Sequence, residues 1–145
     1  MKIINEFRMT VDSKSINEGF SRTAVAAFAA QLDPTLDEIS DIKMAVSEAV
    51  TNCIVHAYPD SVGKIYIYAA ILEGGTVKIS VRDRGCGIID VKQAMEPLFT
   101  TLGGERAGLG FAVMESFTDK ITVHSVCEKG TTVTMYKKIN GRAAL

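Results

Sequence analysis

Alternation of hydrophobic and polar positions predicts five strands along the chain. The clearest run is TVKISVRD at 76–83, in which every second residue is apolar until the run ends in Asp83. Comparable runs lie at 2–11, 64–72, 120–127 and 131–139. Short glycine-containing segments at 73–75 and 128–130 separate two pairs of these runs, so each pair is expected to form a hairpin.

Apolar residues at helical spacing predict two long helices. The first covers the alanine-rich stretch 14–31, and the second runs from a cap at Asp33 or Thr35 to about Tyr58, where Pro59 ends it. The apolar stripe of the second helix consists of Ile39, Ile42, Val46, Ala49, Val50, Cys53 and Ala57.

The stretch 84–107 reads as a loop with one helical turn near 90–95. A third helix is expected to begin at the glycines around 108–110 and to end near Phe117. Together these elements predict an α+β fold. It is a two-layer α/β sandwich with helices packed on one face of a mixed, mostly antiparallel sheet.

The composition fits a single domain spanning 1–145. The chain is 47% hydrophobic, which is enough for a substantial core. Its net charge of −1 gives no reason to expect direct binding of nucleic acid or membrane, although local basic patches remain compatible with it.

No apolar run is long enough to cross a bilayer and no signal-peptide pattern is present, so a cytoplasmic location is expected. The three cysteines are widely spaced and odd in number, which favours reduced thiols over a disulfide framework or a metal clip.

Asp83 is unusual because strand parity places its carboxylate on the apolar, inward face. A buried carboxylate needs hydrogen-bond donors, and these could come from backbone amides, a distant arginine or a bound ligand. Gly85 and Gly87 follow, and they would let the backbone approach a bound group closely. Thr131 is expected to face inward beside Asp83, either near a purine or bonded to its own turn.

Glu48 and Asn52 lie one turn apart on the second predicted helix, on the face opposite the apolar stripe. This arrangement is typical of a solvated pair. However, Met44, Ala45 and Val55 lie on the same side, so the face is also expected to be covered. An amide oxygen there could bind Mg²⁺, and a carboxylate could accept a hydroxyl proton. His56, one turn further on, is interpreted as a pocket-rim or surface residue.

The segment 96–111, EPLFTTLGGERAGLGF, is rich in glycine and ends where a helix begins. Unpaired backbone N–H groups at a helix start suit phosphate. Thr100 and Thr101 add hydroxyl groups, and Arg106 adds a guanidinium suited to phosphoryl oxygens. The alternative interpretation is a plain surface loop.

Four segments in this order resemble the GHKL ATPase/kinase family over nearly the whole chain: SEAVTN (47–52), DRGCG (83–87), TTLGGERAGLGF (100–111) and GTTV (130–133). Within that family, two longer segments resemble the anti-sigma factor serine kinases, in particular those of sporulation. They are LDPTLDEISDIKMAVSEAVTNCIVHAY and EPLFTTLGGERAGLGFAVMESF.

The resemblance implies ATP and Mg²⁺ as cofactors and gives roles to individual residues. Asn52 matches the magnesium ligand, Glu48 the general base, and Asp83 the acid that receives the adenine amino group. The remaining nucleotide-binding positions that it implies are Gly85, Gly87, Thr100, Thr101, Arg106, Gly108, Gly110 and Thr131. Arg22 matches a partner-contacting arginine; the alternative is a solvated helix residue.

The resemblance also implies the partners. A homodimer would hold a sigma factor of the sigma-F type inactive and would phosphorylate a serine of an anti-anti-sigma protein of the SpoIIAA type. The strand at 2–11 is the expected dimer surface, because an unpaired edge invites pairing. Two alternatives remain open: a general-stress anti-sigma kinase of the RsbW type, and an ATP-dependent sigma-binding module with negligible kinase activity.

Overall fold

The computed structural model describes residues 1–88 and 110–141. Within them, five strands form one sheet in the order β1-β2-β3-β5-β4. The strands are β1 (Ile3–Asp12), β2 (Lys64–Leu72), β3 (Thr76–Asp83), β4 (Lys120–Val126) and β5 (Gly130–Lys138). All four ladders between neighbouring strands are antiparallel, so the expected mostly antiparallel sheet is confirmed, and these strands include no parallel pair that would make it mixed.

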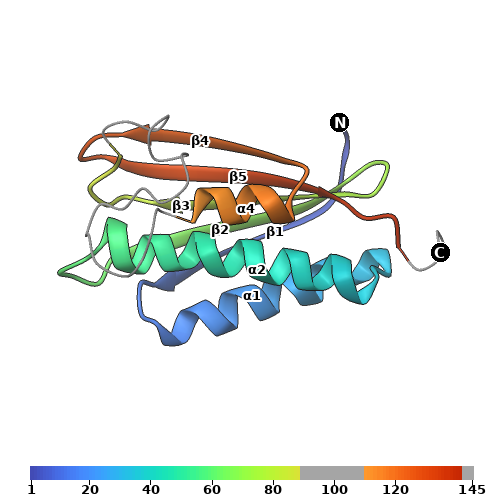
Figure 1. Cartoon of the computed structure of the whole chain (residues 1–145), viewed down its shortest axis with the longest axis horizontal. Helices are drawn as coiled ribbons and strands as arrows, with labels where there is room; N and C mark the ends of the chain where they lie inside the picture. Colours follow the sequence, from blue (N-terminus) through green and yellow to red (C-terminus); the bar gives the residue numbers. More distant parts are fainter. Residues whose placement is uncertain (89–109, 142–145) are drawn as a thin grey trace.

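Three α-helices form the second layer: α1 (Ile16–Ala29), α2 (Leu36–Asn52) and α4 (Phe111–Phe117). They cover one face of the sheet, with α2 between α1 and α4 (Figure 1). A short 3₁₀ turn, η1 (Ala30–Leu32), follows α1, and a π-helical segment, η2 (Cys53–Ala57), follows α2. The α+β sandwich with helices on one face is therefore confirmed.

The core lies between the two layers, as the alternation in the strands predicts. In β3, Val77, Ile79 and Val81 are buried, whereas the residues between them are partly or fully exposed. The helical side contributes Ile42, Val46 and Val50 of α2 to the same core. The opposite face of the sheet carries no helix in the described part of the chain, and it faces solvent (Figure 1).

The start of α2 is fixed by a reciprocal pair of hydrogen bonds. Glu38 N donates to Thr35 Oγ1 over 3.1 Å, and Thr35 N donates to Glu38 Oε1 over 2.9 Å. Thr35 is therefore the cap, and Asp33 instead occupies a left-handed conformation after η1. The Glu38 carboxylate also accepts the amides of Asn140 and Gly141, which ties the segment after β5 to this helix start.

Helix α2 ends differently from the prediction. An uninterrupted helix to Tyr58 was expected, but the α-helix stops at Asn52 and continues as the wider turn of η2. The amide of Tyr58 donates to the carbonyl of Cys53, a bond across five residues, over 3.0 Å. The helical turn expected near 90–95 lies outside the described residues. No helix in the described ranges is long and apolar enough to cross a membrane.

Candidate nucleotide site

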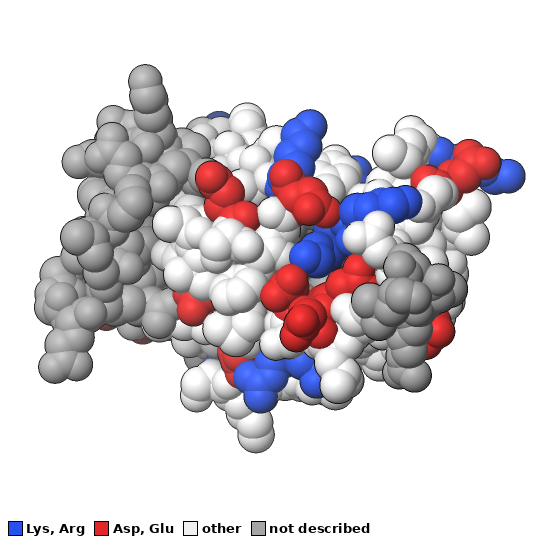
Figure 2. Space-filling view, turned by 45° about the vertical axis from the view of Figure 1, so that its right-hand side comes forward, with Lys and Arg blue, Asp and Glu red and all other residues white. Residues whose placement is uncertain are grey.

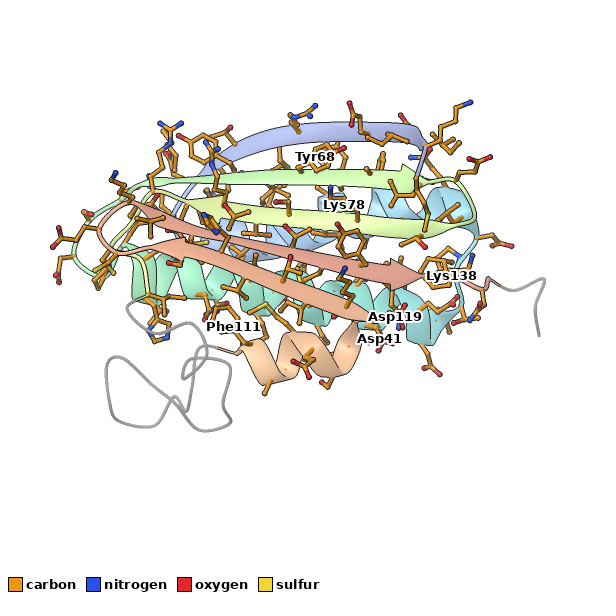
Figure 3. The ribbon with its side chains drawn as sticks, turned by 90° about the horizontal axis from the view of Figure 1, so that it is seen from above. Asp41, Tyr68, Lys78, Phe111, Asp119 and Lys138 are labelled. Carbon is orange, nitrogen blue, oxygen red and sulfur yellow. The ribbon has the colours of Figure 1, made fainter. Side chains whose placement is uncertain are left out.

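A cavity of about 240 Å³ opens between the end of α2, η2 and the ends of β3 and β5. Its walls are mostly apolar, with a few polar groups, which is typical of a small-molecule site. Phe111, at the start of α4, forms part of the wall (Figure 3). Asn52, Asp83, Gly87 and Thr131, four of the residues singled out from the sequence, line this one cavity.

The carboxylate of Asp83 points into the molecule, as strand parity predicts, and the residue is only 6% exposed. Gly85 N and Thr131 N donate to its Oδ1 over 3.0 and 3.2 Å, and Cys53 Sγ donates to Oδ2 over 3.6 Å. Burial raises the pKa of Asp83, and these three donors offset part of that effect. Backbone amides and a thiol, rather than an arginine, therefore support this carboxylate.

Thr131 joins the cavity to the β4–β5 hairpin through a hydroxyl network. It is buried and faces inward, as predicted, and its Oγ1 lies 2.7 Å from Ser125 Oγ. Ser125 also accepts the amide of Ile88 over 2.8 Å and lies 3.2 Å from the carbonyl oxygen of Gly130, to which it can donate. The hairpin thereby fixes the turn after Asp83.

Gly85 and Gly87 are required by close contacts within the protein. A Cβ at Gly85 would lie 2.3 Å from the carbonyl oxygen of Ala57, and one at Gly87 would lie 2.4 Å from that of Val126. Gly87 also has a positive φ of 74°. The two glycines thus let the turn wedge between η2 and the β4–β5 hairpin. Gly87 also lines the cavity, so it is placed where a bound base could contact it, and that contact stays a prediction.

The interpretation of Glu48 and Asn52 as a solvated pair is wrong for Asn52. It is buried at the edge of the core, and neither Oδ1 nor Nδ2 has a hydrogen-bond partner among the described residues. The expectation that this face is covered is correct. An unpaired amide in a buried position is costly, so it indicates a site that a ligand completes.

Glu48 lies one turn before Asn52 and beside the start of α4. A Cβ at Gly110 would lie 2.4 Å from Glu48 Oε2. A side chain at position 110 would therefore clash with the Glu48 carboxylate. Gly110 has a positive φ of 74° and is the residue from which α4 begins. Glu48 is partly buried and lies outside the residues that line the cavity itself.

Two cavity residues were missed as site residues from the sequence. Cys53 was counted only as part of the apolar stripe, yet its thiol bonds Asp83, and burial, followed by that carboxylate, raises its pKa well above the ordinary value. His56 was interpreted as a pocket-rim or surface residue; it is buried and lines the cavity, so the surface alternative is wrong. Cys53 continues the apolar stripe of α2, whereas His56 lies within the turn of η2, which no local sequence signal marks.

The other predicted site residues lie elsewhere. Arg22 is on α1, where its guanidinium bonds the Glu18 carboxylate over 2.7 Å. Thr100, Thr101, Arg106 and Gly108 lie outside the described residues. The described residues contain no group of three or more His, Cys, Asp or Glu that could hold a metal ion.

The fold and the cavity agree with comparisons to known proteins. The histidine kinase-like ATPase domain family matches residues 17–137, and the chain belongs to that family. Within it the chain belongs with the anti-sigma F factors. It is 57% identical to the anti-sigma F factor of Caldanaerobacter subterraneus subsp. tengcongensis, over 96% of this chain and 97% of that protein. It is 49% identical to that of Geobacillus kaustophilus, over 97% of each chain.

Solved structures share the fold at lower identity. The RsbU and RsbW domains of a Mycobacterium tuberculosis protein align with a TM-score of 0.69 and 24% identity, over 93% of this chain and 32% of that one. The mycobacterial sensor histidine kinase MprB aligns with a TM-score of 0.58 and 15% identity, over 90% of this chain and 97% of that one.

Proposed function

We propose that the chain binds ATP with Mg²⁺ in the cavity beside Asp83, inhibits a sigma factor of the sigma-F type and phosphorylates a serine of an anti-anti-sigma protein of the SpoIIAA type. The observation that carries the nucleotide site is the buried Asn52 amide, which lacks a partner among the described residues and lines the same cavity as Asp83. A purely structural cavity would gain nothing from an unpaired amide.

Asp83 and Thr131 are proposed to hold the adenine. Among the described residues, Oδ2 of Asp83 accepts only from the weak thiol donor Cys53, so it keeps acceptor capacity for an exocyclic amino group. The Thr131 hydroxyl, held by Ser125, adds a group that can both donate and accept. Gly87 and Gly85 keep the turn close to the base, and the apolar wall supplies stacking area.

Asn52 fits the role of magnesium ligand. Its Oδ1 is a hard oxygen, and Mg²⁺ typically takes one or two protein oxygens and keeps several waters. Bound magnesium would neutralise charge on the phosphates. Glu48, one turn away and beside Gly110, is proposed to accept the proton of the attacking serine hydroxyl. Thr100, Thr101, Arg106, Gly108 and Gly110 are proposed to contact the phosphates.

The relatives support the choice of partner. The two named above are anti-sigma F factors, and identity of 57% over nearly the full length favours a sigma-F type partner over the RsbW type. Arg22 is proposed to contact that partner. Its pairing with Glu18 orients the guanidinium on the surface of α1, where its side chain is 42% exposed. The chain is proposed to act as a homodimer.

The proposal is tested by incubating the purified chain with Mg²⁺ and ATP labelled at the γ-phosphate, together with the anti-anti-sigma protein of the same cell. Labelled phosphoserine on that protein, and ATP-dependent capture of the sigma factor by the chain, are the expected results. Capture of the sigma factor without labelling of the anti-anti-sigma protein would support the alternative, an ATP-dependent sigma-binding module with negligible kinase activity. Neither capture nor labelling would refute the proposal.

A further inference from the structure

The outer face of the sheet, which faces away from the helices, carries a ladder of tyrosines and cations. Each of three tyrosine rings is approached by two basic side chains. Arg82 and Arg84 lie 4.8 and 4.9 Å from the ring centre of Tyr66, and Arg8 and Lys78 lie 4.6 and 6.0 Å from that of Tyr68. Lys78 and Lys120 flank the ring of Tyr136 at 5.8 and 5.6 Å.

Strand register makes the ladder continuous. Lys78, Tyr136 and Lys120 form one row across β3, β5 and β4. The pairs Arg8–Tyr68 and Tyr66–Arg82 form the next two rows on the neighbouring strands. Figure 3 looks onto this face, with Tyr68 and Lys78 on the central strands and the helices behind them.

The positive charge of this ladder is largely uncompensated. Arg8 has a carboxylate partner, Glu6, at 3.5 Å, and that pair is exposed. Lys78, Arg82, Arg84 and Lys120 have no salt bridge to any described carboxylate. Elsewhere, as on the face seen in Figure 2, acidic and basic side chains lie intermixed. The net charge of −1 therefore averages over an uneven distribution.

The surface between the cations is open and polar. Ser80, Thr134 and Thr122 continue the Arg8–Tyr68 row across β3, β5 and β4 and offer hydroxyl groups. A shallow hollow of about 280 Å³ lies on this face and is lined by residues such as Arg8, Tyr66 and Arg82. Such a surface can follow a flexible chain over several strands.

We propose that the outer face binds single-stranded nucleic acid. Its phosphates would pair with Lys78, Lys120 and the arginines, and its bases would stack on the tyrosine rings and guanidinium groups. Nucleic acid offers one stackable base for each phosphate, which matches the alternation of tyrosines and cations, whereas the carboxylates of an acidic polypeptide would leave the tyrosine rings unused. A second copy of the chain would place like charges opposite each other.

This activity is separate from nucleotide binding. Arg82 points outward and Asp83 inward on the same strand, so the two surfaces lie on opposite faces of the sheet. A variant such as Asp83→Asn should therefore lose ATP and keep the oligonucleotide. Failure of one proposal is then distinguishable from failure of the other.

The test is fluorescence anisotropy with a labelled oligothymidylate of roughly 16 nucleotides. Binding is expected at low salt and should weaken between about 50 and 200 mM salt, with a log–log slope near −2.8 for four phosphate contacts. Lys78→Gln with Lys120→Gln should reduce affinity about tenfold and bring the slope to about −1.4. The matched control, Lys14→Gln with Lys43→Gln, changes the net charge equally at exposed positions, one just before α1 and one on α2, and it should have little effect.

A second variant separates stacking from charge. Tyr136→Leu keeps the charge and much of the bulk, and it should weaken binding by about five- to a hundredfold. The proposal is overturned if the unaltered chain shows no binding at low salt, or if the control pair weakens binding as much as the test pair. It is also overturned if Tyr136→Leu has no effect and polyglutamate competes as well as the oligonucleotide, which would indicate an acidic protein partner. A change of oligomeric mass in the test pair alone would indicate an interface between copies and would equally overturn it.

Discussion

The backbone amide of Thr131 donates to Oδ1 of Asp83 over 3.2 Å. This hydrogen bond joins the start of β5 to the end of β3. Together with Gly85 N, it satisfies one oxygen of a carboxylate that is almost fully buried. The other oxygen faces Cys53 Sγ at 3.6 Å, a weak donor. One oxygen thus maintains the fold, and the other is available to a ligand.

Asp83→Asn is predicted to weaken ATP binding and spare the fold. Oδ1 of asparagine can still accept both amides, but the group at the Oδ2 position can become a donor, which would face the adenine amino group. Loss of a hydrogen bond to a charged acceptor is worth about 1.5–3 kcal/mol, or roughly ten- to a hundredfold in affinity by calorimetry. Asp37→Asn, at an exposed position of α2, is the control. Unaltered ATP affinity in Asp83→Asn would exclude the adenine assignment.

The pKa of Asp83 gives the sign of its effect on stability. Because burial raises that pKa in the folded state, the folded chain holds the proton more tightly than the unfolded chain. The stability that protonation contributes is present at low pH and is lost as the pH rises through the folded pKa. At neutral pH the ionised carboxylate therefore lowers the stability of the folded chain. Asp83→Asn should melt at the same temperature as the unaltered chain or slightly higher.

Much of this site follows from the sequence, because period-two alternation determines which face each strand residue occupies. The inward position of Asp83, and the neighbouring position of Thr131, could both be predicted in this way. Backbone amides were among the expected donors to Asp83, but the Cys53 thiol was not, because the tertiary packing of α2 on β3 brings it to the carboxylate. The π-helical turn of η2, which no local pattern signals, contains His56, and both Cys53 and His56 lie on the wall of the cavity.

The position of Asn52 shows the limit of helical-wheel reasoning. Asn52 was expected to lie opposite the apolar stripe, but its helical angle lies beside the stripe, so its burial depends on what packs against that flank. Helix α4 begins there, at Gly110 and Phe111, about sixty residues later in the sequence. Tertiary contacts of this kind turn a polar flank into a cavity wall, whereas the bounds of the strands follow from the sequence to within a residue or two.

Glu48→Gln is predicted to keep ATP binding and to lose phosphoryl transfer. The amide retains the shape of the side chain beside Gly110 but cannot accept the serine proton, which should cost about 10²–10⁴ in rate. Transfer of labelled phosphate and calorimetric ATP binding are measured together. Glu115→Gln, at an exposed position of α4, is the matched control. Transfer at the normal rate in Glu48→Gln would remove Glu48 from the role of base.

Two glycine substitutions should have opposite effects on stability. In Gly85→Ala, the new Cβ meets the Ala57 carbonyl oxygen at 2.3 Å, so η2 and the turn must separate. In Gly19→Ala, within α1, the nearest atom is 3.8 Å away, and alanine is about 0.5–1 kcal/mol better than glycine in a helix interior. Thermal melts should show Gly85→Ala below the unaltered chain and Gly19→Ala above it. If the two variants melt alike, the close approach at Gly85 is not a determinant of the fold.

Glu38 is predicted to stabilise the fold in a pH-dependent way. Burial by itself raises the pKa of Glu38, but the amides of Thr35, Asn140 and Gly141 and the Thr35 hydroxyl outweigh it and hold the pKa below its ordinary value. Such a carboxylate contributes stability above the unfolded pKa, about 4.3, and loses it as the pH falls through the lower folded pKa. Glu38→Gln should cost about 1–3 kcal/mol at pH 7, and the difference in melting temperature should shrink towards pH 3. A constant difference over this range would show that the charge plays no part.

The edge of β1 supplies the last prediction, which concerns the proposed homodimer. On the described strands β1 pairs only with β2, and its first residues, Ile3 and Ile4, are 46% and 58% exposed. Deleting the strand would also remove Phe7 and Met9, which pack against the core, so a substitution is the sharper test. Ile4→Lys places a charge on the edge and should shift the mass by light scattering from twice the chain mass towards the monomer. Val62→Lys alters a similarly exposed apolar residue in a turn and should leave the dimer intact. A dimer that persists in Ile4→Lys with unchanged affinity would place the interface on another surface.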